Sequence, residues 1–421
     1  MPTWSSPSRS SAALTGPADR SEYLWEVLRT LWPEPARIVR SGRGRPGRPG
    51  EAEFLVVPDE RRAKLLLPRR PRRAAAAALR HYKASADTPR RLAFRSLALA
   101  AQAGLADILP HRISIETARG AADADISAYL SGVLDREAII SLRIGAPRAN
   151  RKPVLELLTA DGGLIGFAKV GVNALTCELV RAEAAALAVL NAAPLVRLGT
   201  PRLIHHGQWC GHEVLVQEAL SGVAPPRRWT GLSQAMAELA AVQGVTHLTM
   251  DQSPYWHDLR QRLAACAQRD MGGMLLKAMS YLEPAAATTS MAFGAWHGDW
   301  TPWNMTTSGG RALVWDWERF QSGVPVGYDA VHYRLQALVN GRSAPQASAE
   351  AAMADAPAVL APFGIQPDTA RLVASLYLIE IAVRYLRDGQ AEAGARLGDV
   401  GTWLLPVLMR HAQGADVSGA P

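Results

Sequence analysis

Eight consecutive residues, His297 to Asn304, read HGDWTPWN and place a carboxylate and a carboxamide five positions apart. Twelve positions after Asn304, a second carboxylate, Asp316, follows the apolar part of LVWDWE. Phosphoryl transfer requires a base or positioning group for the acceptor hydroxyl and Mg²⁺ ions that bridge the phosphates. Asp299 suits the first role, while Asn304 and Asp316 offer the hard oxygen ligands that Mg²⁺ prefers. These residues therefore indicate a metal and phosphate site.

A hairpin is expected between the two motifs. Residues 305–307 and 311–315 read as short strands, and the Ser-Gly-Gly between them is a turn signal. Such a hairpin would fold Asp316 back beside Asn304, so that the base and the metal ligands share one cleft. The alternative is that these Asp and Asn side chains only cap turns, as they often do.

HGDWTPWN and LVWDWE together resemble the motifs of the aminoglycoside phosphotransferase and choline kinase family, whose fold is similar to that of protein kinases. In that family, the residue matching Asp299 is the catalytic base, and the residues matching Asn304 and Asp316 bind Mg²⁺. The resemblance implies an ATP- and Mg²⁺-dependent small-molecule kinase that moves the γ-phosphoryl group to a hydroxyl. It also implies an α+β, bilobal kinase-like fold with a small β-rich lobe and a large helical lobe.

A lysine and a glutamate upstream fit the same interpretation. Lys169 alternates with apolar residues in LIGFAKVG, as expected of a strand. Glu183 lies four positions from Leu179 and Leu187, on the otherwise apolar stripe of a helix expected over about 176–190. Their pairing would leave the ammonium free to contact the α and β phosphates, as the corresponding pair does in kinases. The alternative is that both side chains are solvated.

The nucleotide-binding hinge is expected at the end of HEVLVQEAL, which resembles the connection between kinase lobes. By that resemblance, backbone groups from Glu218 to Leu220 would bind the adenine edge. An ordinary strand end is the alternative.

The connection between the strands expected at 138–145 and 154–158 contains a single glycine and no glycine-rich phosphate-binding motif. Its basic residues, Arg148, Arg151 and Lys152, could contact phosphate. An exposed basic turn is the preferred interpretation.

Composition and punctuation divide the chain into five segments. The kinase resemblance begins only near residue 136, so an N-terminal α/β extension precedes it, and this extension could pack on the small lobe, recruit a partner or shape substrate entry. The expected segments are a disordered tail, short helix and basic linker at 1–50, the extension at 51–135, the small lobe at 136–220, the helical large lobe at 221–412 and a disordered tail at 413–421.

The net charge of +8 is concentrated near the N-terminus, where residues 1–95 contain 20 Lys and Arg against 9 Asp and Glu. A nucleic-acid-associated regulator is one alternative function, although nucleic acid is an unlikely partner because no recognised binding motif accompanies the basic residues. A catalytically weak, kinase-like scaffold is another, but its expected signature, motif loss, is absent. Residues 219–421 contain 17 acidic and 15 basic residues, which favours a neutral or anionic hydroxyl acceptor over a polycationic one.

The remaining composition indicates a cytoplasmic enzyme with no membrane partner. No leading apolar segment resembles a signal peptide, and no apolar stretch reaches the roughly 18 residues of a membrane span. The three cysteines form no CxxC pair, so neither a disulfide framework nor a zinc site is indicated. Tryptophans crowd both motifs, and core packing is preferred over ligand stacking for them. The sequence does not define the oligomeric state.

Overall fold

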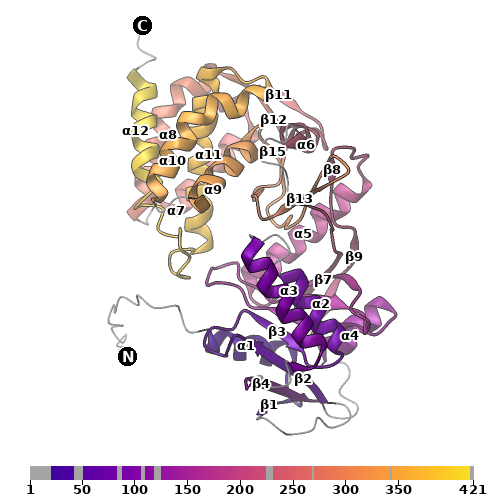
Figure 1. Ribbon diagram of the computed structural model, residues 1–421. Helices are drawn as coiled ribbons and strands as arrows, with labels where there is room; N and C mark the ends of the chain where they lie inside the picture. Colours follow the sequence, from indigo (N-terminus) through magenta and orange to yellow (C-terminus); the bar gives the residue numbers. More distant parts are fainter. Residues whose placement is uncertain are drawn as a thin grey trace, which may run out of the picture.

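The computed structural model describes residues 20–41, 51–82, 88–105, 110–117, 125–223, 231–267, 270–341 and 344–417. They form the predicted α+β fold with two lobes (Figure 1). The strands of the large sheet and helices α1 to α5 form one lobe, and helices α7 to α12 lie together in the other. The predicted N-terminal tail and most of the basic linker lie outside the described residues.

The small lobe contains a nine-stranded antiparallel sheet in the order β1-β4-β2-β3-β5-β6-β7-β10-β9. Its strands are β1 Arg37–Ser41, β2 Glu51–Val57, β3 Leu65–Pro68, β4 Arg112–Glu116, β5 Ile139–Arg143, β6 Val154–Leu158, β7 Leu164–Gly171, β9 Leu203–Trp209 and β10 His212–Glu218.

The N-terminal extension and the small lobe share this sheet. Strand β3 of the extension pairs with β5, where Leu66 lies opposite Leu142. The Ser141 hydroxyl also donates to the Leu66 carbonyl at 3.0 Å. The boundary placed at 135/136 therefore falls within one continuous sheet, and the extension packs on the small lobe through backbone pairing.

Alternation along the strands determines which helices cover each face. Phe54 and Val56 pack with helices α1 (Ser21–Leu31) and α4 (Ile126–Leu134). Leu55, between them, packs on the opposite face with helices α2 (Arg72–Tyr82) and α3 (Thr88–Gln102). Because successive strand residues face opposite sides, both faces of the extension's sheet are buried.

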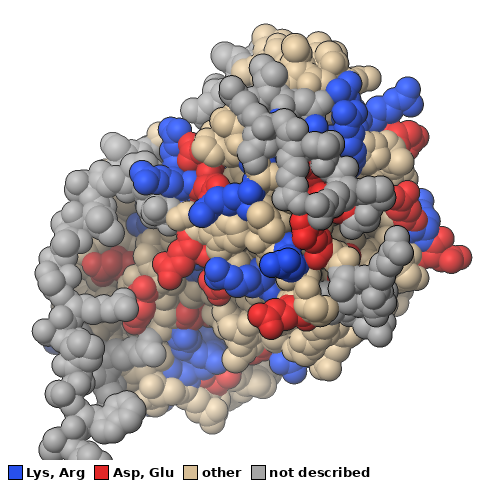
Figure 2. Space-filling view, turned by 90° about the horizontal axis from the view of Figure 1, so that it is seen from below, with Lys and Arg blue, Asp and Glu red and all other residues tan. Residues whose placement is uncertain are grey.

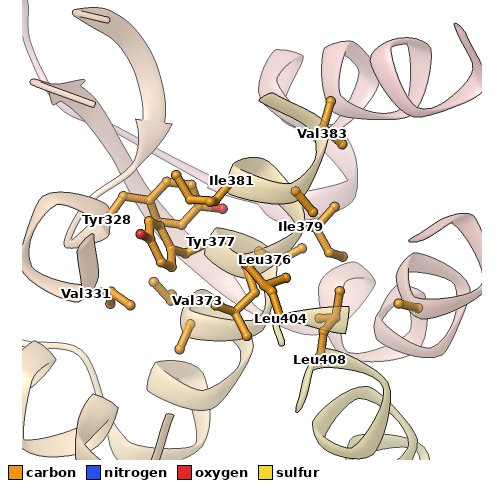
Figure 3. Close-up of a cluster of buried hydrophobic side chains, with 14 of the residues drawn as sticks. Tyr328, Val331, Val373, Leu376, Tyr377, Ile379, Ile381, Val383, Leu404 and Leu408 are labelled. Atoms are coloured by element: carbon orange, nitrogen blue, oxygen red, sulfur yellow. The ribbon is translucent and has the colours of Figure 1, made fainter. Parts of the chain in front are cut away.

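Most helices of the large lobe share one apolar core. Tyr328, Tyr377 and Leu408, from three different helices, are among the buried side chains of this core (Figure 3). Its helices are α6 Gly231–Ala240, α7 Pro254–Cys266, α8 Asp270–Thr288, α9 Tyr328–Gly341, α10 Pro345–Leu360, α11 Pro367–Asp388 and α12 Leu405–Val417. Two small sheets flank it, ordered β11-β12-β15 and β13-β14-β8. Their strands are β8 Leu198–Gly199, β11 Thr246–Thr249, β12 Ser290–Trp296, β13 Met305–Ser308, β14 Arg311–Val314 and β15 Gln321–Pro325.

The C-terminal helix differs from the prediction. Helix α12 continues to Val417, so a tail that begins at residue 413 is wrong for residues 413–417. Among the described residues, none of the helices is long and apolar enough to cross a membrane.

Acidic and basic side chains are interspersed on the face seen in Figure 2. The densest basic segment, SGRGRPGRPGE, lies almost entirely outside the described residues.

A fragment spanning residues 136–421 should aggregate when it is produced without the extension. Removal of the extension would leave β5 as an open edge and uncover apolar side chains on both faces of the sheet. Size-exclusion chromatography and circular dichroism, compared with the full chain, measure this. A folded, monomeric fragment would contradict the shared-sheet interpretation.

Candidate active site

The HGDWTPWN loop follows strand β12 (Ser290–Trp296) and is anchored by Asp329 in the first turn of α9. The Asp329 carboxylate accepts hydrogen bonds from the backbone N–H groups of His297 at 2.7 Å and Gly298 at 3.1 Å. Burial raises the pKa of Asp329 to about 7. The Asp329 side chain thus supports the HGDWTPWN loop through its backbone.

Gly298 is required by the backbone at this position. Its φ is 82°, and a Cβ atom would lie 2.5 Å from the carbonyl oxygen of Arg319. Its own carbonyl accepts a hydrogen bond from Arg384 at 2.5 Å. The loop is therefore fixed on both sides of the glycine.

His297 is held as a neutral imidazole inside the loop. Its Nδ1 accepts from the backbone N–H of Asp299 at 3.0 Å, so Nε2 bears the proton and donates to the Trp315 carbonyl at 3.0 Å. Burial lowers the pKa of His297 to about 4. The imidazole, protonated at Nε2, thus connects the backbone of the HGDWTPWN loop to that of the second motif at Trp315.

The Asp299 side chain is partly exposed, at 38%. One carboxylate oxygen accepts from Asn304 Nδ2 at 3.0 Å, and the other lies 3.1 Å from Nε2 of His332. Nδ1 of His332 is in turn 2.7 Å from the hydroxyl of Tyr377. The sequence interpretation missed His332 and Tyr377; the available signal was that His332 lies one helical turn after Asp329.

The hairpin between the motifs is present as β13 (Met305–Ser308) paired with β14 (Arg311–Val314). The backbone N–H of Trp315 donates to the Asn304 carbonyl at 3.1 Å, which brings the second motif back to the first. Asp316 follows with a φ of 76°. A non-glycine residue in this region costs of order 1 to 3 kcal/mol and is concentrated at functional sites.

Lys169 connects the two lobes. Its ammonium donates to both carboxylate oxygens of Glu183 at 2.7 Å and to Asp316 at 2.5 Å. Lys169 lies on β7, and Glu183 on α5 (Ala174–Ala192), whose first turn is fixed by an Asn173–Thr176 capping box. Burial lowers the pKa of Lys169, but Asp316 and Glu183 outweigh it and raise the pKa overall.

A further carboxylate, Glu318, joins this cluster. Carboxylate oxygens of Glu183, Asp316 and Glu318 all lie within 4.8 Å of one another. Glu318 forms an ion pair with Lys152 and accepts from Asn150 at 2.8 Å. The prediction of an exposed basic turn is wrong for Lys152, which is buried. Glu318 was visible as the last residue of LVWDWE but received no role.

The hinge residues lie at the end of β10. The backbone N–H of Glu218 donates to the Arg202 carbonyl at 2.9 Å, so it is already engaged. The Glu218 side chain is exposed and Leu220 is half-buried. The Glu218 N–H is therefore not free to donate to an adenine edge, and the hinge contact stays a prediction for the backbone groups beyond it.

Residues 174–379 match the model of the phosphotransferase enzyme family. This segment belongs to that family. The match includes Glu183 and all three motif residues, and begins five positions after Lys169. It confirms the predicted family and enzyme class, a phosphotransferase acting on small molecules.

Solved structures similar to this phosphotransferase are distant. A protein proposed to be a fructosamine-3-kinase, from Haemophilus somnus 129PT, is 13% identical, with a TM-score of 0.44, over 69% of this chain and 96% of its own. A thermostable mutant of an aminoglycoside phosphotransferase is 13% identical, with a TM-score of 0.43, over 70% and 99%. An amicoumacin kinase is 11% identical, with a TM-score of 0.39, over 66% and 88%. Among curated proteins, none matches the chain.

The neutral His297 should make the phosphotransferase sensitive to acid. An unfolded histidine takes up a proton near pH 6.5 and the folded one only near pH 4, so the contribution of His297 to folding stability should fall by roughly 3 kcal/mol as the pH drops between them. Thermal unfolding from pH 7 to pH 4 measures this. His297→Asn should flatten the dependence, and the exposed His247→Asn should retain it. Equal slopes in both variants would exclude His297 as the source.

Proposed function

We propose that the phosphotransferase moves the γ-phosphoryl group of ATP to a hydroxyl of a small molecule in a Mg²⁺-dependent reaction. The observation that carries this proposal is the convergence of Lys169 and Glu183, from the small lobe, on Asp316 of the large lobe. Asp299 opens to solvent on the same loop that delivers Asn304 to this junction. A reaction that uses ATP in this way is expected in the cytoplasm.

Each side chain has a distinct role in the proposal. Asp299 accepts the proton of the acceptor hydroxyl, and its hydrogen bonds to Asn304 and His332 fix the direction of its carboxylate. Lys169 contacts the α and β phosphates, with Glu183 as its fixed counter-charge. Asn304 and Asp316 hold Mg²⁺.

The residues at the proposed Mg²⁺ site fit a hard divalent cation. Three carboxylates approach within 4.8 Å of one another, and Lys169 and Lys152 form ion pairs with them. Burial raises the pKa of Asp316, but these two ammonium groups outweigh it and hold the pKa below its usual range, so the carboxylate is ionised and ready to bind metal. When bound, Mg²⁺ supplies charge neutralisation along the phosphates.

The adenine and acceptor sites rest on less specific features. The Glu218 carbonyl and the backbone at Leu220 would read the adenine edge. The acceptor would be a neutral or anionic hydroxyl compound, since residues 219–421 have nearly balanced charge. Trp303, at 45% exposure the one tryptophan of the HGDWTPWN loop that is open to solvent, offers a face on which such a compound could stack.

The test is a screen of sugars, hydroxylated metabolites and antibiotics with γ-labelled ATP, scored by transferred label. Transfer to at least one acceptor, dependent on Mg²⁺, is the expected result. The proposal fails if the folded protein neither binds ATP with Mg²⁺ nor transfers label to any hydroxyl compound.

Asp299→Asn should lower kcat by roughly 10² to 10⁴, because the amide keeps the shape of the side chain but cannot accept the proton. Nucleotide affinity should be nearly unchanged. Turnover with the best acceptor and calorimetric titration with ATP separate the two effects. A wild-type kcat in this variant would remove Asp299 from the role of base.

Asp316→Ala should abolish the Mg²⁺-dependent part of nucleotide binding, since it removes a metal ligand and the large-lobe partner of Lys169. The matched control is Asp368→Ala, whose side chain is 98% exposed. Titration with ATP, with and without Mg²⁺, measures both. Metal-dependent binding that survives in the Asp316 variant would contradict the assignment.

A further inference from the structure

We propose that Lys152 is a second phosphate-binding lysine of the nucleotide site and that the N-terminal extension holds it in place. The inference rests on the proposed function and adds to it a residue outside the family match and a role for the extension. It starts from the β5–β6 connection, which has no glycine-rich turn and contacts Glu318 through Asn150 and Lys152.

Lys152 lies at the metal and phosphate cluster rather than on the surface. Its side chain is 7% exposed and forms an ion pair with Glu318, which is equally buried. Glu318 in turn lies within 4.8 Å of both Asp316 and Glu183. Glu318 thus lies between the ammonium of Lys152 and the two carboxylates that pair with Lys169.

A bound divalent cation would change the charge balance of the cluster in favour of phosphate. Three carboxylates and two ammonium groups lie together in a largely buried cluster that is net negative without a metal, and an unpaired charge there would be costly. A cation held by Asp316 would also lie near Glu318, because oxygens of the two carboxylates are within 4.8 Å of each other, and it would compete with the lysines for those oxygens. Lys152 then needs another anion within reach, and the phosphates of a bound nucleotide provide it.

The extension fixes the connection on its other side. Arg151 immediately precedes Lys152 in the sequence. Its guanidinium lies 3.3 Å from the ring centroid of Tyr23 on α1. At the start of the connection, Ile144 donates to the Lys64 carbonyl at 3.0 Å and accepts from Arg20 at 3.4 Å. Both ends are therefore braced by residues N-terminal to the kinase-like lobes.

This arrangement replaces flexible backbone donors with a positioned side chain. A glycine-rich loop binds phosphate through its N–H groups and needs a backbone free of side chains. Here a basic connection, braced by α1, delivers a single ammonium. The alternative is that the Lys152–Glu318 pair, with the contact from Ala149 to Gln390 at 3.3 Å, only ties the lobes together.

Binding measurements on the full chain separate these readings. Lys152→Met should weaken ADP binding in Mg²⁺ by about tenfold or more, the loss of one charged hydrogen bond, and leave adenosine binding unchanged. Arg148→Met, an exposed change in the same connection, should alter neither. Tyr23→Ala should weaken ADP binding in the same direction, and Tyr23→Phe should not.

Glu318→Gln gives an independent readout that does not depend on how well the Lys152 variant folds. It removes the carboxylate that competes for Lys152, so ADP binding without Mg²⁺ should tighten severalfold. Unchanged ADP affinity in Lys152→Met, or an equal loss for ADP and adenosine, would overturn the inference. Failure of the wild-type protein to bind Mg²⁺-ATP would instead overturn the proposed function.

Discussion

The structure depends on one buried ammonium that is shared between two lobes. Lys169 forms ion pairs with Glu183 of its own lobe and Asp316 of the other. Without it, these buried and half-buried carboxylates would lose that counter-charge. The strand, the capped helix and the hairpin that carry these side chains have to meet within hydrogen-bond distance. Their packing around this contact therefore determines how the side chains of the site are placed.

Apolar packing positions the HGDWTPWN loop, and polar contacts orient it. Trp300 and Trp317, one from each motif, are fully buried in a cluster that also contains Leu187 of α5. The preference for packing over ligand stacking is confirmed for these two rings. Asp329 and His297, which are both buried, bind the loop backbone, so the position of Asp299 is fixed by groups that are shielded from solvent.

Several features were determined by the sequence alone. The order of the two aspartates and the asparagine in the motifs, the strand around Lys169 and the hairpin after Asn304 are all local patterns, with period-two alternation or short turn signals. The Lys169–Glu183 contact could also be expected, because each is a lone charge on an otherwise apolar face and needs a partner of opposite charge. The family and the α+β fold followed from these patterns.

Other features were decided only by tertiary structure. The contact of Lys152 with Glu318 joins residues 166 positions apart, and that of Asp299 with His332 joins different elements. The union of the extension and the small lobe in one sheet depends on pairing between β3 and β5. From the sequence alone, Lys152 is compatible with an exposed turn, and the extension is compatible with a separate domain. Local sequence records propensity and period, whereas the partner of a buried charge or an open strand edge is set by which distant segments pack together.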